Sequence, residues 1–354
     1  MTHQIGYALI GTADSAVLAA FAEAATNSRL VAVVSGDPQT HALAGESGVA
    51  VYRQDEFRDC VQRDDVNAVY LALPTSMRGD AAVEAARARV HVLCDRPMAV
   101  TADECRRMLR ACQTNHVRLM IAYRLHFHSA HRKLLELVRG GAIGAVKTLG
   151  SDFSVRVENR EDFRRHRRLG GGTLYDLGVS CINTARHVLE AEPAQVMAMT
   201  ARANSRFGGD VDEATVALIR FPDDRLAHFH TSFGEEQSAM LTVFGEDGLI
   251  RLAGAYHAHA PAILEVVRGG AREELRFEPA DQFAAEIEYF SRCILDSRPP
   301  EPSGLDGLRD VRIVEAIYRS ARDGRPVTLP RPDPSLRVPP DRPETLGEGH
   351  DPSR

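Results

Sequence analysis

The sequence predicts an α/β protein of two domains, in which a parallel, doubly wound sheet precedes a second domain rich in strands. Three observations carry this prediction. Apolar runs typical of buried strands alternate with helical patterns through about residue 122, as in sheets whose strands are joined by helices. From residue 146 onward, short strand patterns follow one another, several separated only by turn signals. A chain of 354 residues is long enough for two hydrophobic cores.

The composition argues against several classes of function. The chain has 43 Lys and Arg residues against 49 Asp and Glu residues, a net charge of −6, which argues against general nucleic-acid binding. No apolar run approaches the roughly 20 residues of a membrane span, and the first residues lack the pattern of a secretory signal. We therefore expect a cytoplasmic protein that acts on a small molecule, without a nucleic-acid or membrane partner.

The cysteines predict neither a metal site nor a disulfide framework, because they are scattered and form no Cys-x-x-Cys pair. We expect most of them to be small core residues. They are Cys60, Cys94, Cys105, Cys112, Cys181 and Cys293.

The first predicted unit has the order of a dinucleotide-binding βαβ motif. An apolar strand at Ile5–Ile10 ends at Gly11, and a helical pattern at residues 17–22 is followed by a strand at Leu30–Val34. Asp37 then stands 26 positions after Gly11, in the order expected for the acid that binds the adenosine ribose. Further strands are expected at Val66–Leu73, Val90–Leu93 and Val117–Ala122, with helices at Ala81–Ala88 and Ala102–Gln113.

The turn after the first strand departs from the usual pyrophosphate-binding pattern. Such a turn has glycine at three places, and here only Gly11 is a glycine. Backbone N–H groups at the start of a helix can still hold an anion, whereas the carboxylate of Asp14 would repel it. The sequence leaves open whether tight binding is retained. The turn residues expected to contact the cofactor are Gly11, Thr12, Ala13, Asp14 and Ser15.

The residues after the second strand favour NAD over NADP. Gly36 and Asp37 are also expected to contact the cofactor, and the Asp37 carboxylate can bind the ribose hydroxyl groups. No Lys or Arg stands close to Asp37 in the sequence to bind a 2′-phosphate.

Polar residues follow the carboxyl ends of two further predicted strands. Thr75 and Arg78 follow one strand, and Asp95 and Arg96 follow the next. In open α/β sheets, ligands bind at this edge. The alternative interpretation is that the prolines in these segments only mark ordinary loops. The residues expected to contact the cofactor here are Leu73, Pro74, Thr75, Asp95, Arg96 and Pro97.

A triple glycine at 170–172 precedes the most informative segment, which ends at His187. Glycines permit a backbone path that side chains would forbid, and the predicted helix after them has one polar face and one apolar face. We expect the polar face to be presented to a ligand while the apolar face is buried. The polar residues are Asp176, Ser180, Asn183 and His187.

These motifs together resemble the Gfo/Idh/MocA oxidoreductases, over roughly residues 5–330. The segment Cys181–Arg186 resembles the glucose-fructose oxidoreductase branch of the family, which often favours NADP. The segments that carry the resemblance are Val92–Ala99, Ala122–Phe127, Gly170–His187, Arg220–Pro222 and Glu301–Gly304.

The resemblance implies a Rossmann domain, expected at residues 1–123, and a C-terminal α+β domain with a large, mainly antiparallel sheet, expected at residues 124–330. The outer face of that sheet commonly pairs subunits in the family, so we expect a homo-oligomer. Residues 331–354 are rich in proline and charge, and we expect a disordered tail. Strands are expected at Val146–Val157, Gln195–Ala203, Ala214–Phe221, Leu226–Phe233, Met240–Phe244 and Leu249–Leu252, and helices at Gln282–Leu295 and Leu305–Arg322.

The resemblance also implies hydride transfer between NAD(P) and a sugar or polyol. Arg96 stands where the family has a lysine, and arginine orients and polarises an oxygen but does not act as a base. Asp176 matches the family's aspartate, and Ser180 stands where the family has a proton-transferring Tyr or His. We expect Arg96, Asp176 and Ser180 to be the catalytic positions. Tyr175, Tyr123 and His126 are alternative proton carriers, none favoured over the others.

Several arginines predict an anionic substrate, if they face the cleft. Arg78 and the run at 164–168 would make it cationic, whereas the alternative is a solvated run balanced by nearby acids.

A second alternative is a catalytically inactive homologue that binds a ligand or partner, because the phosphate turn, the Lys and the Tyr or His are all altered. The residues expected to contact substrate are Arg78, Tyr123, Arg124, Arg168, Tyr175, Asp176 and Asn183.

Overall fold

The computed structural model describes residues 4–12, 17, 19–21, 24, 26–46, 48–202, 208–258 and 260–330. The predictions for Ala13, Asp14 and Ser15, and for the tail at 331–354, concern residues outside this set. Among the described residues, none of the helices has the length and apolar character needed to cross a membrane.

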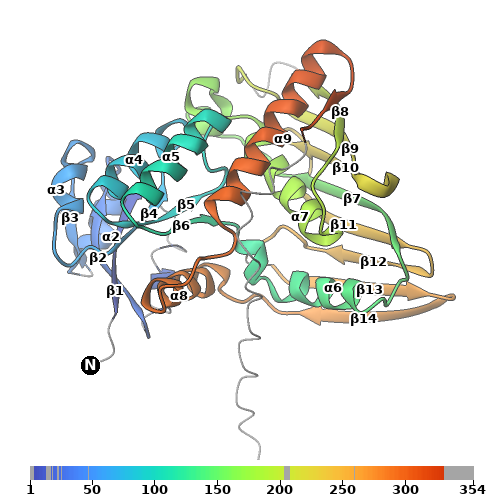
Figure 1. The fold of residues 1–354 in the computed structure, drawn as a ribbon, viewed down its shortest axis with the longest axis horizontal. Coiled ribbons are helices and arrows are strands. Elements are labelled where there is room, and N and C mark those ends of the chain that lie inside the picture. The colour runs from blue at the N-terminus through green and yellow to red at the C-terminus, as the bar shows by residue number, and fades with distance from the viewer. Residues whose placement is uncertain are drawn as a thin grey trace, which may run out of the picture.

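The first sheet is parallel and doubly wound, as the sequence predicts (Figure 1). Its chain order reverses on either side of β1, which places the topological switch point at the carboxyl end of that strand. The strands in spatial order are β3 (Ala50–Tyr52), β2 (Ser28–Val34), β1 (Ile5–Gly11), β4 (Ala68–Ala72), β5 (His91–Asp95) and β6 (Leu119–Ala122). The associated helices are α2 (Pro38–Glu46), α3 (Phe57–Val61), α4 (Thr75–Arg87) and α5 (Ala102–Thr114).

Gly11 is required where β1 meets β4. Its φ is +111°, and a Cβ on it would lie 2.2 Å from the carbonyl oxygen of Ala72. A side chain at this position would therefore force the two strand ends apart.

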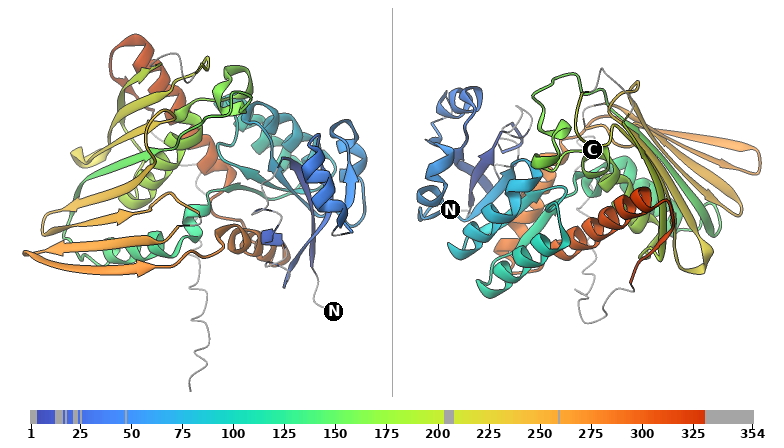
Figure 2. Two further views of the ribbon diagram at one scale, coloured as in Figure 1. Left: turned by 180° about the vertical axis from the view of Figure 1, so that it is seen from behind. Right: turned by 90° about the horizontal axis from the view of Figure 1, so that it is seen from above.

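The second sheet has nine strands and is antiparallel except between β7 and β10. One side packs against helices α6 (Ser129–Arg139), α7 (Val179–Leu189) and α9 (Gly304–Asp323), and no described helix covers the other side (Figure 2). The strands in spatial order are β14 (Ala271–Phe277), β13 (Ala262–Arg268), β12 (Gly248–Ala253), β11 (Ser238–Gly245), β7 (Val146–Ser154), β10 (Leu226–Ser232), β9 (Ala214–Arg220), β8 (Gln195–Ala201) and β15 (Val327–Thr328).

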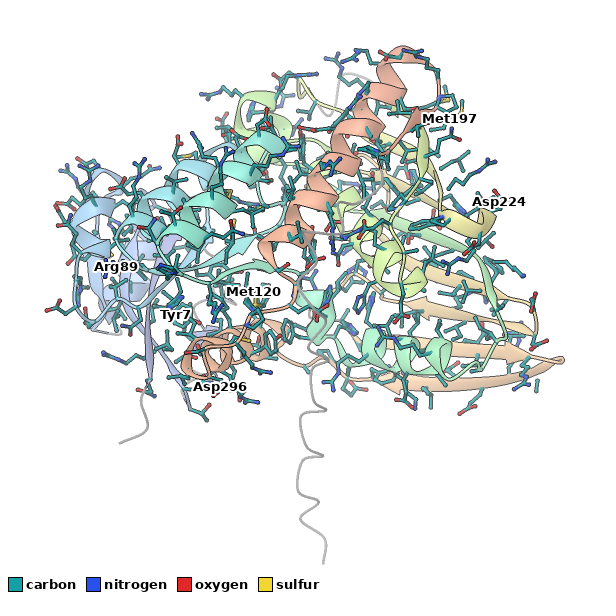
Figure 3. The ribbon with its side chains drawn as sticks, viewed as in Figure 1. Tyr7, Arg89, Met120, Met197, Asp224 and Asp296 are labelled. Carbon is teal, nitrogen blue, oxygen red and sulfur yellow. The ribbon has the colours of Figure 1, made fainter. Side chains whose placement is uncertain are left out.

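Two helices near the end of the described chain join the sheets. Helix α8 (Gln282–Leu295) follows the second sheet in sequence but packs on the first, where Ile287 and Phe290 share a core with Tyr7 of β1 (Figure 3). Helix α9 contacts both α5 and β8 (Figure 1). A Cβ on Gly307 of α9 would lie 2.8 Å from a side-chain carbon of Ile121. These contacts bring the carboxyl edge of the first sheet against the second domain.

Candidate functional site

The site forms where the end of β5 meets the segment that follows the triple glycine. Arg96 Nη1 donates to the backbone oxygen of Asp176 at 2.7 Å and to its carboxylate Oδ1 at 3.2 Å. The two side chains are 18% and 20% exposed, so each keeps some access to solvent. The structure brings these two predicted positions into contact, although they stand 80 residues apart.

The Arg96 guanidinium remains charged at every relevant pH. Burial lowers the pKa of Arg96, but the carboxylates of Asp176 and Asp95 outweigh burial, so the pKa lies above its ordinary value. A fixed positive charge beside an accessible carboxylate can orient and polarise a substrate oxygen.

Arg78 does not contact substrate as the sequence analysis expected. Its side chain is 2% exposed, and its guanidinium donates to the backbone oxygens of Leu73, Asp95 and Pro97 and to the Asp95 carboxylate. These bonds link the ends of β4 and β5, because carbonyl groups at both strand ends accept hydrogen bonds from the same guanidinium. Arg78 therefore has a structural role beneath the site.

The arginine run does not make the cleft strongly cationic. Arg164 is paired with Asp162 at 2.6 Å and lies 3.5 Å from Asp176. Arg165 is buried and donates to the backbone oxygens at 157 and 158, and Arg167 bonds to Asp210. Arg168 is exposed. For this run the structure favours the alternative of balanced charge, because Asp162, Asp210 and backbone oxygens accept hydrogen bonds from most of its arginines.

The helix after the triple glycine starts with a π-helical turn at Leu174–Gly178 and continues as α7. Its polar face is largely buried, which corrects the expectation that the whole face meets a ligand. Ser180 is 3% and Asn183 is 7% exposed. The Asn183 amide pairs with His126 Nε2 at 2.9 Å and donates to Asp310 at 2.9 Å, so it connects α7 to its neighbours in place of the predicted substrate contact.

The glycine run permits close contact with both domains. A Cβ on Gly170 would lie 2.7 Å from the Cβ of Thr75 at the start of α4, and one on Gly172 would lie 2.4 Å from Asp212 Oδ1. Asp212 also accepts from the hydroxyl of Thr173 and the backbone N–H of Leu174. It anchors the start of the π-helical turn that carries Asp176. Sequence reasoning missed Asp212, because it stands between Asp210 and Glu213 just before β9 and nothing in the sequence distinguishes it from these two acids.

The two tyrosines named as alternative proton carriers are unsuited to act as bases near neutral pH. Burial raises the pKa of Tyr175, whose hydroxyl donates to the Val100 carbonyl at 2.7 Å. Burial and then the nearby carboxylate of Asp310 raise the pKa of Tyr123 well above its ordinary value. Tyr123 is 2% exposed, so the predicted substrate contact requires a movement that this structure does not show.

Arg124 and Glu286 lie behind the site. Arg124 donates to Gln282 Oε1 at 3.0 Å and to the backbone oxygen of Tyr256 at 2.7 Å, and burial followed by the charge of Arg96 lowers its pKa to about 10. Glu286 of α8 is completely buried. It was missed because a single glutamate in an amphipathic helix carries no sequence signal.

Comparisons with known proteins match both parts of this architecture. The family model described as oxidoreductase family, NAD-binding Rossmann fold, matches residues 5–123, and the GFO/IDH/MocA C-terminal domain model matches residues 131–251. The crystal structure of aldose-aldose oxidoreductase from Caulobacter crescentus is 32% identical, with a TM-score of 0.86 over 92% of this chain and 100% of that one. The chain belongs to the Gfo/Idh/MocA oxidoreductase family. It is accordingly an NAD(P)-dependent oxidoreductase.

Curated relatives agree with this Gfo/Idh/MocA assignment. D-xylose 1-dehydrogenase [NADP(+)] from Haloarcula marismortui is 28% identical over 280 residues, 78% of each chain. dTDP-3,4-didehydro-2,6-dideoxy-alpha-D-glucose 3-reductase from Streptomyces violaceoruber is 30% identical over 320 residues, 88% of this chain and 91% of the relative.

The cofactor edge of this Gfo/Idh/MocA protein differs in one respect from the sequence argument. Asp37 accepts from the backbone N–H and hydroxyl of Thr40, at 2.9 and 2.6 Å, at the start of α2. Arg53 directly follows Tyr52, which pairs with Val34 across β2 and β3. An arginine therefore does stand at the neighbouring strand end, although it is 16 positions away in sequence.

Proposed function

We propose that the protein transfers hydride between NAD(P) and a CH–OH carbon of a sugar or polyol. The observation that carries this proposal is the contact between Arg96 and Asp176 at the carboxyl edge of the first sheet. Open α/β sheets bind ligands at this edge. The sugar and sugar-nucleotide substrates named for the relatives support the substrate class.

The cofactor fits the described residues at the edge. Gly11 has no side chain where the first strand ends, and the buried carboxyl of Glu286, within electrostatic range of Asp95 at the end of β5, has no hydrogen-bond partner among the described residues. Leu73, Thr75 and Asp95 remain proposed contacts. When bound, the nicotinamide supplies or accepts the hydride.

We assign separate roles to the three catalytic positions. Arg96 orients and polarises the reacting substrate oxygen, and Asp176 exchanges the hydroxyl proton through its carboxylate, which is one-fifth exposed. Ser180 lies four residues, about one helical turn, beyond Asp176 but is 3% exposed, so we assign it a role in packing beside the acid and no proton transfer.

A neutral substrate fits the charge pattern better than an anionic one. Asp176, Asp95 and Asp162 each lie within ion-pair distance of an arginine. Among the predicted substrate contacts, Arg168 is the exposed arginine. We infer an uncharged polyol or aldose at the reacting centre.

For the cofactor, we infer that NADP+ binds at least as well as NAD+. The sequence-based preference for NAD rested on the absence of a cation near Asp37 in the sequence, and Arg53 stands at the adjacent strand end. Its side chain is 70% exposed and its guanidinium pairs with Asp55, so a 2′-phosphate could reach it from solvent but would compete with that carboxylate. The relative D-xylose 1-dehydrogenase [NADP(+)] is named for NADP(+), which agrees with this inference.

The direct test is titration of the purified chain with NADPH and NADH, followed by reduced-nucleotide fluorescence, and then turnover on a panel of neutral and anionic sugars. We expect binding and measurable turnover with a neutral aldose or polyol. Absence of binding at millimolar cofactor would remove the proposal. Binding without turnover on any substrate would favour the inactive-homologue alternative.

We also propose that a second copy of the chain covers the outer face of the second sheet. Large apolar side chains are exposed there, and Met199 is 77% exposed; Met197 is labelled at this face in Figure 3. Contiguous exposed apolar surface is typical of an interface. Sedimentation should show an oligomer that Met199→Glu together with Leu218→Glu dissociates, and a monomeric wild type would refute the proposal. The exposed residues are Met197, Met199, Val216, Leu218, Leu226 and Phe244.

A further inference from the structure

Glu286 is a completely buried carboxyl group that has no hydrogen-bond partner. The residue is 0% exposed, and neither Oε1 nor Oε2 meets a donor among the residues that the structure describes. Buried polar groups are nearly always hydrogen-bonded in native proteins, so an unpaired carboxyl beside a binding edge indicates a function that the protein alone does not complete.

The main charged neighbours of Glu286 come from the carboxyl edge of the first sheet. They are Asp95 and Arg96, which end or follow β5, and Arg124, which follows β6. Gln282 lies one helical turn before Glu286 and accepts from Arg124 Nη1 at 3.0 Å. That bond holds the guanidinium against the same part of α8.

Tyrosines from two further strands are also buried in this part of the molecule. Burial first, and the charge of Glu286 to a lesser extent, raise the pKa of Tyr7 of β1 and of Tyr70 of β4. The Tyr7 hydroxyl bonds to Ser291 at 2.8 Å, and burial raises its pKa. Neither tyrosine ionises near neutral pH, because burial also raises the pKa of Tyr70 well above its ordinary value.

The surroundings of Glu286 disfavour the ionised form of its carboxyl group. Burial raises the pKa of Glu286 well above its ordinary value, and the nearby carboxylate of Asp95 raises it further. Arg124 and Arg96 act in the opposite direction without reversing the shift. A further positive charge at the edge would therefore favour loss of the proton.

The two redox forms of the cofactor differ in such a charge. The oxidised nicotinamide ring carries one positive charge and the reduced ring carries none, whereas their phosphate groups are identical. We propose that Glu286 is the counter-charge for the oxidised ring: its carboxyl is protonated in the free enzyme, releases that proton to solvent when NAD(P)+ binds, and keeps it when NAD(P)H binds. This inference rests on the proposed function, because it requires the cofactor at this edge.

The consequence is a pH-dependent preference between the two cofactor forms. Affinity for NADP+ rises with pH by up to about tenfold per unit while binding releases one proton. Affinity for NADPH has no such dependence on Glu286. Contributions from the phosphates cancel when the two forms are compared.

Calorimetry of the full chain in buffers of different ionisation enthalpy measures the protons released on binding. Wild type should release up to one more proton with NADP+ than with NADPH. Glu286→Gln, which keeps the side-chain volume, should abolish this difference. Glu288→Gln is the matched control, because Glu288 lies on the same helix, pairs with Arg292 and is 39% exposed, and it should behave as wild type.

Infrared difference spectra test the wild type without depending on a variant's fold. NADP+ should remove the C=O stretch of a protonated carboxylic acid, NADPH should not, and the change should be missing in Glu286→Gln. The inference is overturned if both forms bind wild type with equal proton release, or if the difference persists in Glu286→Gln. If neither form binds at millimolar concentration, the proposed function itself fails, which is a separate outcome.

Discussion

Acid should destabilise the protein through a cluster of neutral histidines, of which His128 and His131 are buried and His126 and His187 are half-buried. The rings of His126 and His187 lie 4.5 Å apart between centroids, and those of His128 and His131 lie 5.5 Å apart. Burial, followed by the charges of neighbouring His and Arg side chains, lowers the pKa of His187 to about 2 and that of His131 to about 3. Burial, followed by the charge of Arg124, lowers the pKa of His128 to about 4.

The sign follows from proton binding. Below pH 6.5, the ordinary value for histidine, the unfolded chain binds protons that the folded chain does not, so stability falls as the pH falls. At pH 5, one such histidine costs about 2 kcal/mol relative to pH 7, since each pH unit below 6.5 costs about 1.4 kcal/mol. Three of them lower the free energy of unfolding by about 6 kcal/mol. This loss is comparable to the whole unfolding free energy of a typical protein, about 5–15 kcal/mol.

The assay is urea unfolding of wild type and His187→Gln at pH 7 and pH 5, followed by fluorescence and circular dichroism. The variant removes one titrating group, so its loss of unfolding free energy between the two pH values should be smaller than that of wild type by about 2 kcal/mol. His116→Asn is the control, because His116 is exposed and asparagine tolerates its left-handed φ of 57°. An equal loss in wild type and His187→Gln would refute the reasoning.

Three further predictions concern the site. Arg96→Ala should lower kcat/KM on the preferred sugar by about 10²- to 10³-fold, because one preorganised charged donor is lost, and Arg96→Lys should retain more activity; equal rates would exclude the assigned role. Gly172→Ala should lower the melting temperature more than Gly269→Ala. A Cβ on residue 172 would lie 2.4 Å from Asp212 Oδ1, whereas a Cβ on residue 269 would meet nothing within 4 Å. Similar shifts in melting temperature for the two variants would contradict the close contact. Arg53→Gln should weaken NADPH binding by about tenfold, the effect of losing roughly 1.4 kcal/mol, and leave NADH binding unchanged, as fluorescence titration would show.

Five strands of the first sheet were predicted, because strands buried on both faces are continuous apolar runs. The short strand β3 (Ala50–Tyr52) was missed, because none of its residues is fully buried. The predicted run at Val66–Leu73 contains β4, and Leu30–Val34 lies within β2. Strand β14 was missed because its sequence, Ala271–Phe277, is mostly charged and exposed, so it lacks the alternation that marks a half-buried strand.

The central pair of the site was also predictable, and most of its supporting contacts were not. Arg96 and Asp176 stand beside backbone signals, a strand end and a glycine run, that sequence alone reveals. The bonds of Arg78 to three backbone carbonyls leave no such signal, because any carbonyl can accept from a guanidinium. Asp212 is likewise one of three neighbouring acidic residues, and its role depends on contact with Thr173, 39 positions away.

The pattern of charge pairing explains why one buried carboxyl at this edge is unpaired. Arg78 pairs with Asp95 and Arg96 pairs with Asp176, whereas the described acceptors of Arg124 are the neutral groups of Gln282 and Tyr256. Ionised Glu286 would balance Arg124, but burial opposes that ionisation. The free enzyme therefore has one uncompensated positive charge behind Arg96 for as long as Glu286 is protonated. The oxidised nicotinamide ring, placed at this edge, would add a second positive charge. Ionisation of Glu286 would then supply the negative charge that offsets it.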